Sequence, residues 1–410
     1  MKYIFTVITT CFNILIYNAQ EYFQQKVDTY INVELDDERH FLKGFEKMVY
    51  HNYSNSTLDS IVIHLWPNAY KNSSTELAKQ KYEDGSNQFK YAIDKDLGFI
   101  DSLDFNVNGS KVEWNYLDGK IDICVIYLKK PVKKGDSISI TTPFRVKIPS
   151  GRFSRLGHLG QSYQITQWFP KPAVYDKGGW HPMSYLDQGE FYSEFGDYDV
   201  TITVPKNYVL MATGDLQNKD ELAFLDKKAK LTAKLIKENK LPFRDSLGRK
   251  DMSFPESSKE KKTLRFTQKD VHDFAWFTDK RYHVLKGEIE LESKNVTSWA
   301  LFTNSEAKLW ERSIEYINDA TKYFSNWVGE YPYNHVTAVD GTISAGGGME
   351  YPNITVIGKS YDSKSLETVI IHEVGHNWYY GILGSNERDN AWMDEGLNTY
   401  IEIRYMEEKY

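Results

Sequence analysis

The stretch IHEVGHNWYY, at residues 371–380, places two histidines four positions apart within a helical pattern of apolar residues. On an α-helix such residues lie on one face, so His372 and His376 can reach a single ion. Glu373 adjoins the first histidine and can hold a water molecule against that ion. The spacing therefore predicts a helix at roughly 363–380 that carries a metal site.

A third ligand can come from Glu395, which is separated from His376 by 18 residues and begins a second helical pattern at 393–409. Gly381 and Gly384 permit the chain to turn back between the two patterns. The sequence therefore predicts two antiparallel helices that face each other across the ion. Three protein ligands leave one position for water, which is typical of catalytic zinc, whereas a structural site needs four.

Two more acids lie close to this third ligand. Asp394 is the competing carboxylate and, as the immediate neighbour of Glu395, is expected to point away from the seam between the helices. Glu402 falls on the same helix face as Glu395 and is a candidate to orient one of the metal ligands from behind.

A chain of 410 residues exceeds the size that one core normally serves, so two or more domains are expected. The aromatic share of 15% suits a chain rich in strands. The net charge is −7 with both signs dispersed, which gives no electrostatic footprint for nucleic acid.

The first twenty residues, MKYIFTVITTCFNILIYNAQ, have the pattern of a secretory signal peptide, with Lys2 before an apolar stretch and Ala19 near its end. A membrane anchor is the alternative, but the stretch is short for a span and contains polar residues. We therefore expect a secreted or periplasmic protein with no membrane span after signal removal. Cys124 is then the one mature cysteine, which excludes an internal disulfide or a thiolate metal cage.

The chain changes character along its length. Residues 21–295 contain repeated strand-like segments between Gly- and Asn-rich turns, which predicts a large antiparallel β domain. Within it, residues 216–262 are rich in Lys, Glu and Asp and predict a charged helical insertion. Residues 296–410 have mostly helical periodicity with two strand-like segments, which predicts a second domain of mixed α+β type.

The stretch SAGGGMEYPN stands just before the predicted metal-binding helix. Gly346, Gly347 and Gly348 leave backbone groups uncovered, so an extended peptide can pair there as an added strand. After Met349, Glu350 places a carboxylate beside the end of that peptide, where its natural partner is a free α-ammonium. The alternative is a Gly-rich turn with a solvated glutamate.

GGMEY followed by HEVGH, 18 residues and Glu resembles the M1 family of zinc aminopeptidases, in the gluzincin clan. YINVELDDERHFLKGFEKMVYHNYS and TQWFPKPAVYDKGGWHP also resemble that family's N-terminal β domain, so the resemblance covers nearly all of the mature chain. It implies a saddle-like β-sandwich domain followed by a thermolysin-like zinc-peptidase domain. It also implies one Zn²⁺ ion and Glu350 as the anchor for a substrate amine.

The resemblance further implies a second amine contact, from a Gln or Glu of the β domain. In SYQITQWFP, Gln164 fits the register best and Gln167 is the alternative. The family motif GxMEN is altered here, because Tyr351 and Pro352 stand where Asn is usual. This departure bears on substrate preference.

Members of this family use a tyrosine well downstream of the third ligand to stabilise the oxyanion. The chain ends at Tyr410 inside a helical pattern, so we expect a catalytic domain truncated on its C-terminal side. Loss of one oxyanion donor lowers turnover by a factor of about 100 or more, so weak activity is expected.

These features together predict a zinc-dependent metallo-aminopeptidase that removes the N-terminal residue from peptides with a free N-terminus, with Glu373 as general base. Two alternatives stay open: a thermolysin-like endopeptidase, and a non-catalytic peptide-binding scaffold that keeps the peptidase fold. A purely structural zinc domain is disfavoured because only three ligands are in view.

Overall fold

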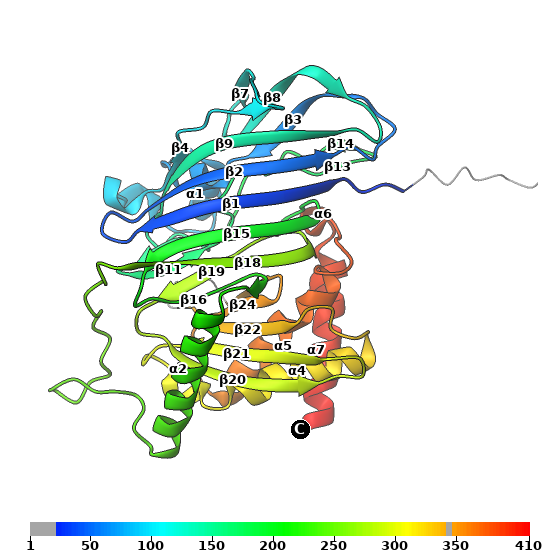
Figure 1. Ribbon diagram of the computed structural model, residues 1–410. Helices are drawn as coiled ribbons and strands as arrows, with labels where there is room; N and C mark the ends of the chain where they lie inside the picture. The colour runs from blue at the N-terminus through cyan, green and yellow to red at the C-terminus, as the bar shows by residue number, and fades with distance from the viewer. Residues whose placement is uncertain (1–21, 342–346) are drawn as a thin grey trace, which may run out of the picture.

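The computed structural model describes residues 22–341 and 347–410 (Figure 1). The first part of the chain forms a β-rich region, and the last part forms a smaller region in which helices cover a second sheet. The predicted signal peptide, residues 1–20, and the predicted edge glycine Gly346 lie outside the described residues. No helix within the described ranges is long and apolar enough to cross a lipid bilayer.

A nine-stranded sheet dominates the β-rich region, in the order β17-β18-β15-β1-β2-β9-β5-β6 with β4 also paired to β9. Its long strands alternate buried and exposed residues because one face packs on the core. The sheet is antiparallel as predicted, except that β1 and β15 run parallel. The strands are β1 (Lys26–Asp36), β2 (Phe41–His51), β4 (Phe99–Asp101), β5 (Asn106–Val107), β6 (Ser110–Lys111), β9 (Ser137–Lys147), β15 (Gly196–Pro205), β17 (Asp215–Leu216) and β18 (Lys261–Val271).

Smaller sheets and short helices complete this region. One four-stranded sheet contains β10 (Gly157–Leu159), β11 (Ser162–Ile165), β19 (Trp276–Asp279) and β16 (Val209–Ala212). A second contains β12 (Lys171–Pro172), β3 (Leu58–His64), β8 (Lys120–Val132) and β7 (Trp114–Leu117), and β13 (Tyr175–Asp176) pairs with β14 (Gly179–Trp180). The short helices are η1 (Trp66–Tyr70), α1 (Glu76–Glu83), η2 (Phe89–Tyr91) and η3 (Asp94–Asp96).

A five-stranded sheet organises the second region, in the order β20-β21-β22-β24-β23. Its strands are β20 (His283–Glu290), β21 (Asn295–Phe302), β22 (His335–Asp340), β23 (Gly348–Tyr351) and β24 (Ile354–Ile357). The sheet therefore starts at β20, and the domain boundary predicted after residue 295 falls within β21, near the turn that joins it to its partner β20. β23 is an edge strand, with β24 as its neighbour in the sheet.

Helices flank this sheet on both sides (Figure 1). The charged insertion contains α2 (Lys219–Lys237), an amphipathic helix that packs on β20 through Leu225 and Ala229. On the other side α4 and α5 pack against the sheet and each other, and α7 packs on α5. The helices are α3 (Ala307–Trp310), α4 (Ser313–Trp327), α5 (Ser363–Tyr379), α6 (Glu387–Ala391) and α7 (Leu397–Lys409).

The two predicted C-terminal helices are present, but the segment before α7 is different in kind. α5 begins at its N-cap Asp362, whose side chain accepts a hydrogen bond from the Ser365 backbone N–H. Residues Trp392–Gly396 form a single π-helical turn, η4, between α6 and α7. The predicted third metal ligand, Glu395, lies in this turn rather than in a regular helix, and such turns occur frequently at functional sites.

One change in α5 tests how closely these helices pack. A Cβ atom added at Gly375 would lie 2.0 Å from Asn398 Oδ1 and 2.5 Å from Phe324 Cζ. We therefore expect Gly375→Ala to lower the free energy of unfolding by roughly 1–3 kcal/mol in urea denaturation, although alanine favours helix. Gly396→Ala is the control, because its Cβ would meet only Trp392, at 3.8 Å. Equal losses in both variants would contradict the packing argument.

Candidate metal centre and active site

Three side chains from α5 and η4 converge on one point. The Nε2 atoms of His372 and His376 are 3.1 Å apart. Oε2 of Glu395 lies 3.1 Å from Nε2 of His372 and 3.8 Å from Nε2 of His376. The helical spacing of the two histidines and the π turn at Glu395 bring together the three ligands that the sequence predicts.

The far side of each imidazole ring is held by a carboxylate. Glu402 Oε2 lies 2.9 Å from Nδ1 of His372, and Asp394 Oδ1 lies 2.5 Å from Nδ1 of His376. A proton on each Nδ1 leaves the Nε2 lone pair facing the centre of the site, which is the tautomer that binds metal. Asp394 is outside the three-ligand group, but the expectation that it points away from the seam is wrong, because it is fully buried and contacts His376 across the seam. Its adjacency to Glu395 in the sequence did not reveal this role.

The donor set fits a zinc ion. Two imidazole nitrogens and one carboxylate oxygen are the ligands that zinc prefers at catalytic sites, at roughly 2.0–2.2 Å from the ion. Tetrahedral ligands at that range are roughly 3.3–3.5 Å apart, which is close to the separations of 3.1 to 3.8 Å found here. The groups present can therefore close around one ion with little movement.

Glu373 lies beside these ligands on α5 and is 6% exposed. Burial raises the pKa of its carboxyl to about 7, against the opposing charges of His376 and His372. Its Oε2 atom has no hydrogen-bond partner among the described residues. A carboxylate with a pKa near neutrality and a free oxygen next to the metal site can act as a general base.

The edge strand β23 passes directly against Glu373. A Cβ atom at Gly348 would lie 2.4 Å from Glu373 Oε1, so any larger residue there would displace the Glu373 side chain. Gly347 has open space where a side chain would stand, and Met349 is buried. The glycine edge predicted for an added peptide strand therefore lies beside the candidate base, with Gly346 outside the described residues.

Glu350 on β23 is 8% exposed, and its Oε1 atom is buried without a hydrogen-bond partner in the described part of the chain. One of its oxygens lies within 4.8 Å of ligand atoms of Glu373 and His376. Burial raises the pKa of this carboxyl well above its usual range, against the charge of His376, and the acids Glu190 and Asp394 add to the rise. Glu350 is therefore not a solvated turn residue. Its unpartnered oxygen and the neighbouring acids can accept hydrogen bonds from a cation.

The two glutamines proposed as amine contacts lie in different places. Gln164 is buried in β11, paired with β10 and β19. Gln167 accepts a hydrogen bond of 3.2 Å from the Tyr351 hydroxyl, so it contacts the residue next to Glu350.

Sequence reasoning missed two acids that the structure brings to Glu350. Glu190 comes from the loop between β14 and β15, and Glu387 from α6, and one oxygen of each lies within 4.8 Å of the others and of Glu350. Arg155 donates to Glu190 Oε1 at 2.7 Å. These residues carry no local motif, so only the tertiary fold reveals them.

The two C-terminal tyrosines, Tyr405 and Tyr410, contact α5 through Glu367. The hydroxyls of Tyr405 and Tyr410 each lie 2.5 Å from a carboxylate oxygen of Glu367, and Lys409 Nζ lies 2.6 Å from the same carboxylate. These contacts join the C-terminal end of the chain to the first half of α5.

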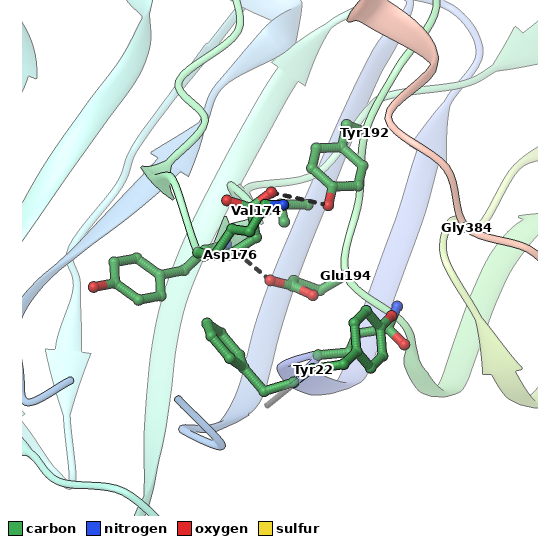
Figure 2. Close-up of a pocket in the computed structure, with 10 residues that line it drawn as sticks. Tyr22, Val174, Asp176, Tyr192, Glu194 and Gly384 are labelled. Carbon is green, nitrogen blue, oxygen red and sulfur yellow. Dashed lines mark hydrogen bonds between the residues drawn. The ribbon is translucent and has the colours of Figure 1, made fainter. Parts of the chain in front are cut away.

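A separate pocket of about 380 Å³ lies where the N-terminal segment meets the β13–β14 hairpin and the turn after α5 (Figure 2). Glu194 accepts a 2.9 Å hydrogen bond from the Tyr175 backbone N–H, and the Tyr192 hydroxyl donates to Asp176. Burial raises the pKa of Glu194 to about 8. None of the candidate ion-binding groups found among the described residues lines this pocket, so it is distinct from the metal centre.

Solved structures share this fold over nearly the whole chain. An M1 zinc metallopeptidase of Deinococcus radiodurans, in a mutant form, superposes with a TM-score of 0.58 at 14% identity over 94% of this chain and 72% of that one. The same protein bound to a Tyr-Ser-Ala substrate gives a TM-score of 0.55 at 13% identity, with 94% and 72% coverage. The chain therefore has the fold of the M1 zinc metallopeptidases, and the resemblance and the predicted fold class are confirmed.

Curated relatives match a shorter segment. Leukotriene A-4 hydrolase of Xenopus laevis is 35% identical over 60 residues, which is 14% of this chain and 10% of that protein. Leucine aminopeptidase 2 of Aspergillus niger is 37% identical over 62 residues, with 15% and 10% coverage. The matched segment thus spans a tenth of each curated relative. No protein-family model matches the chain.

Zinc binding should release protons. Without metal, burial lowers the pKa of His372, but its hydrogen bonds with Glu395 and Glu402 outweigh burial and raise it to about 10. The pKa of His376 is also raised well above its usual range, because Glu350 and Asp394 outweigh burial. His372 is thus protonated at neutral pH and must lose a proton to bind zinc, so we expect release of at least one proton near pH 7.5. Calorimetry in buffers of different ionisation enthalpy measures this number.

The variant Glu402→Ala tests whether the hydrogen bond between Glu402 and His372 is a cause of the proton release. It removes one acceptor from His372, so fewer protons should be released and zinc affinity should fall about 10- to 100-fold. Proton release near zero in the unaltered protein would contradict the protonation states given above.

Proposed function

We propose that this chain carries a zinc-dependent aminopeptidase of M1 type, which hydrolyses the first peptide bond of peptides with a free N-terminus. The observation that carries the proposal is the buried Glu350 carboxyl, on an edge strand beside the three-ligand group, whose Oε1 has no hydrogen-bond partner in the described part of the chain. The N-terminal signal pattern supports a secreted or periplasmic location.

Zinc held by His372, His376 and Glu395, one ion per site, would supply Lewis acidity towards the scissile carbonyl and towards the attacking water. Glu373 takes a proton from that water as its oxygen bonds to the carbonyl carbon. The same carboxyl then gives the proton to the leaving nitrogen as the C–N bond breaks. The pKa of about 7 at Glu373 suits both directions of transfer near neutral pH.

Glu350 would fix where the substrate begins. A free α-ammonium bound by this carboxylate ends the peptide there, so only the first peptide bond reaches Glu373 and the metal ligands. The backbone of the following residues can pair with the outer edge of β23, beside Gly348. A peptide substrate is supported by the D. radiodurans structure, which is described as bound to Tyr-Ser-Ala.

The two alternatives fit the geometry less well. An endopeptidase needs a groove that continues past the scissile bond on both sides, whereas the buried acid Glu350 lies at one end. A scaffold without turnover has no need of Glu373, which is buried beside the candidate zinc ligands with an oxygen unpartnered within residues 22–341 and 347–410.

Replacing the base separates catalysis from folding. Glu373→Gln is expected to lower kcat for aminoacyl-coumarin substrates by about 100- to 10,000-fold with zinc still bound, because the proton acceptor is lost. Chelation should stop hydrolysis by the unaltered protein, and added zinc should restore it. N-acetylated substrates serve as the comparison, and their cleavage would indicate an endopeptidase. No cleavage of either series with zinc bound would favour the scaffold.

A second variant tests the amine anchor. Glu350→Gln removes a charge-assisted hydrogen bond to the ammonium, so kcat/KM for free-amine substrates should fall about 10- to 100-fold. The measurement is steady-state kinetics on the same aminoacyl series. Glu408→Gln, which changes an exposed glutamate on α7, is the control. An unchanged kcat/KM in Glu350→Gln would remove the anchor from the mechanism.

A further inference from the structure

The separate pocket of about 380 Å³ has the features of a ligand-binding site (Figure 2). Its volume lies within the roughly 300–1,000 Å³ that sites for small molecules occupy. The N-terminal residues 22–24, the stretch 174–177 and the segment before β15 supply most of its lining. Four of the lining residues are aromatic and two are acids: Tyr22, Phe23, Tyr175, Tyr192, Asp176 and Glu194.

One of the two acids, Asp176, is already bound within the protein. Its Oδ1 accepts a hydrogen bond from the Gly178 backbone N–H at 2.6 Å and lies 2.8 Å from His181 Nε2. Its Oδ2 accepts from the Tyr192 hydroxyl at 3.4 Å. Asp176 therefore adds negative charge to the pocket, but its oxygens do not require a ligand.

The other acid, Glu194, is 5% exposed and accepts only backbone N–H groups, from Tyr175 at 2.9 Å and from Gln25. Burial raises the pKa of its carboxyl to about 8 against these hydrogen bonds, and the charge of Asp176 adds to the rise. Lys177 also lines the pocket, but it is exposed and pairs with neither acid within the described ranges. The charged form of Glu194 therefore lacks the cation that so buried a carboxylate requires.

The aromatic walls are fixed by their own packing. The Tyr175 ring lies edge-on to Trp180 with centroids 5.1 Å apart, and 6.5 Å from the ring of Phe23. The Tyr192 ring meets His181 edge-on at 5.4 Å. Ring faces attract a cation, and walls that are already in place reduce the cost of ordering on binding.

The pocket is suited to an organic ammonium. Figure 2 shows the Glu194 carboxyl between the side chains of Tyr192 and Tyr22. The N–H groups of an ammonium can donate to this carboxylate while the apolar part of the ligand contacts the rings. A metal ion fits less well, because it needs several oxygen ligands and Glu194 belongs to none of the metal-ligating groups found among the described residues.

We propose that this pocket is a second binding site, which takes a small primary ammonium attached to a flat apolar group, as in an arylalkylamine. Glu194 pairs with the ammonium, and the rings of Phe23, Tyr175 and Tyr192 contact the apolar part. The pocket shares no residue with the metal centre, so this inference does not rest on the proposed peptidase function.

Calorimetry with 2-phenylethylamine tests the site, and 2-phenylethanol is the uncharged counterpart. The protein is the zinc-loaded full chain with Glu350→Gln, so that the proposed amine anchor of the active site does not contribute. The amine should bind about 10- to 100-fold more tightly than the alcohol, because it forms a charge-assisted hydrogen bond with Glu194.

Adding Glu194→Gln to the same protein should reduce this preference below about threefold, because the amide carries no charge. The amide oxygen can still accept from the Tyr175 backbone N–H, and an unchanged melting temperature verifies the fold. The proposal is overturned if the amine does not bind, if the two probes bind equally to the Glu350→Gln protein, or if the preference survives when Glu194 is also replaced.

A pair of variants at Tyr192 tests the aromatic wall independently of Glu194. Tyr192→Leu removes a ring face and should weaken amine binding about 3- to 30-fold. Tyr192→Phe keeps the ring and loses only the hydroxyl, so its affinity should stay within about twofold of the Glu350→Gln protein. Equal affinities in the two Tyr192 variants would contradict the proposed site.

Discussion

The metal centre depends on the seam between α5 and the segment that follows α6. Asp394 and Glu402 each hold the Nδ1 side of one histidine, and Asn398 donates to the backbone carbonyl of His372 at 2.7 Å. These bonds fix both the rotation of the rings and the distance between the helices. A displacement of the seam would change all three metal ligands together, because Glu395 lies in the same turn as Asp394. The ligand set and its support are therefore one structural unit.

Buried acids are the second constraint, and they link stability to function. Glu350, Glu373 and Glu387 are nearly inaccessible, and burial raises the pKa of each. Unpaired charges in such places cost free energy, so empty sites retain protons and bound cations displace them. In the proposed function, zinc would bind His372, His376 and Glu395, and a substrate ammonium would bind Glu350. Each ligand would then stabilise the folded chain, because the unfolded chain has no equivalent site.

The sequence predicts those residues of the candidate site whose roles follow from short patterns along the chain. His372, Glu373, His376 and Glu395 follow from helical spacing, and Glu350 from its position after the glycines. Three other features depend on tertiary structure and have no local signal. Arg155, Glu190 and Glu387 come together only when the β-rich region packs on the second sheet. The π turn at Glu395 and the pairing of β20 with β21 likewise result from packing, which periodicity does not encode.

The β-rich region is consequently part of the active site rather than an attached support. It supplies Glu190 and Arg155, and through the carbonyl groups of Ser184, Gly189 and Glu190 it binds Arg388 of the second region. One continuous hydrophobic core runs from Val27 to Tyr405, so the two regions do not move apart at little cost. In the proposed function, the residues that carry out hydrolysis all lie in the second region. The acids around Glu350 come from both regions, so their geometry depends on how the regions are packed together.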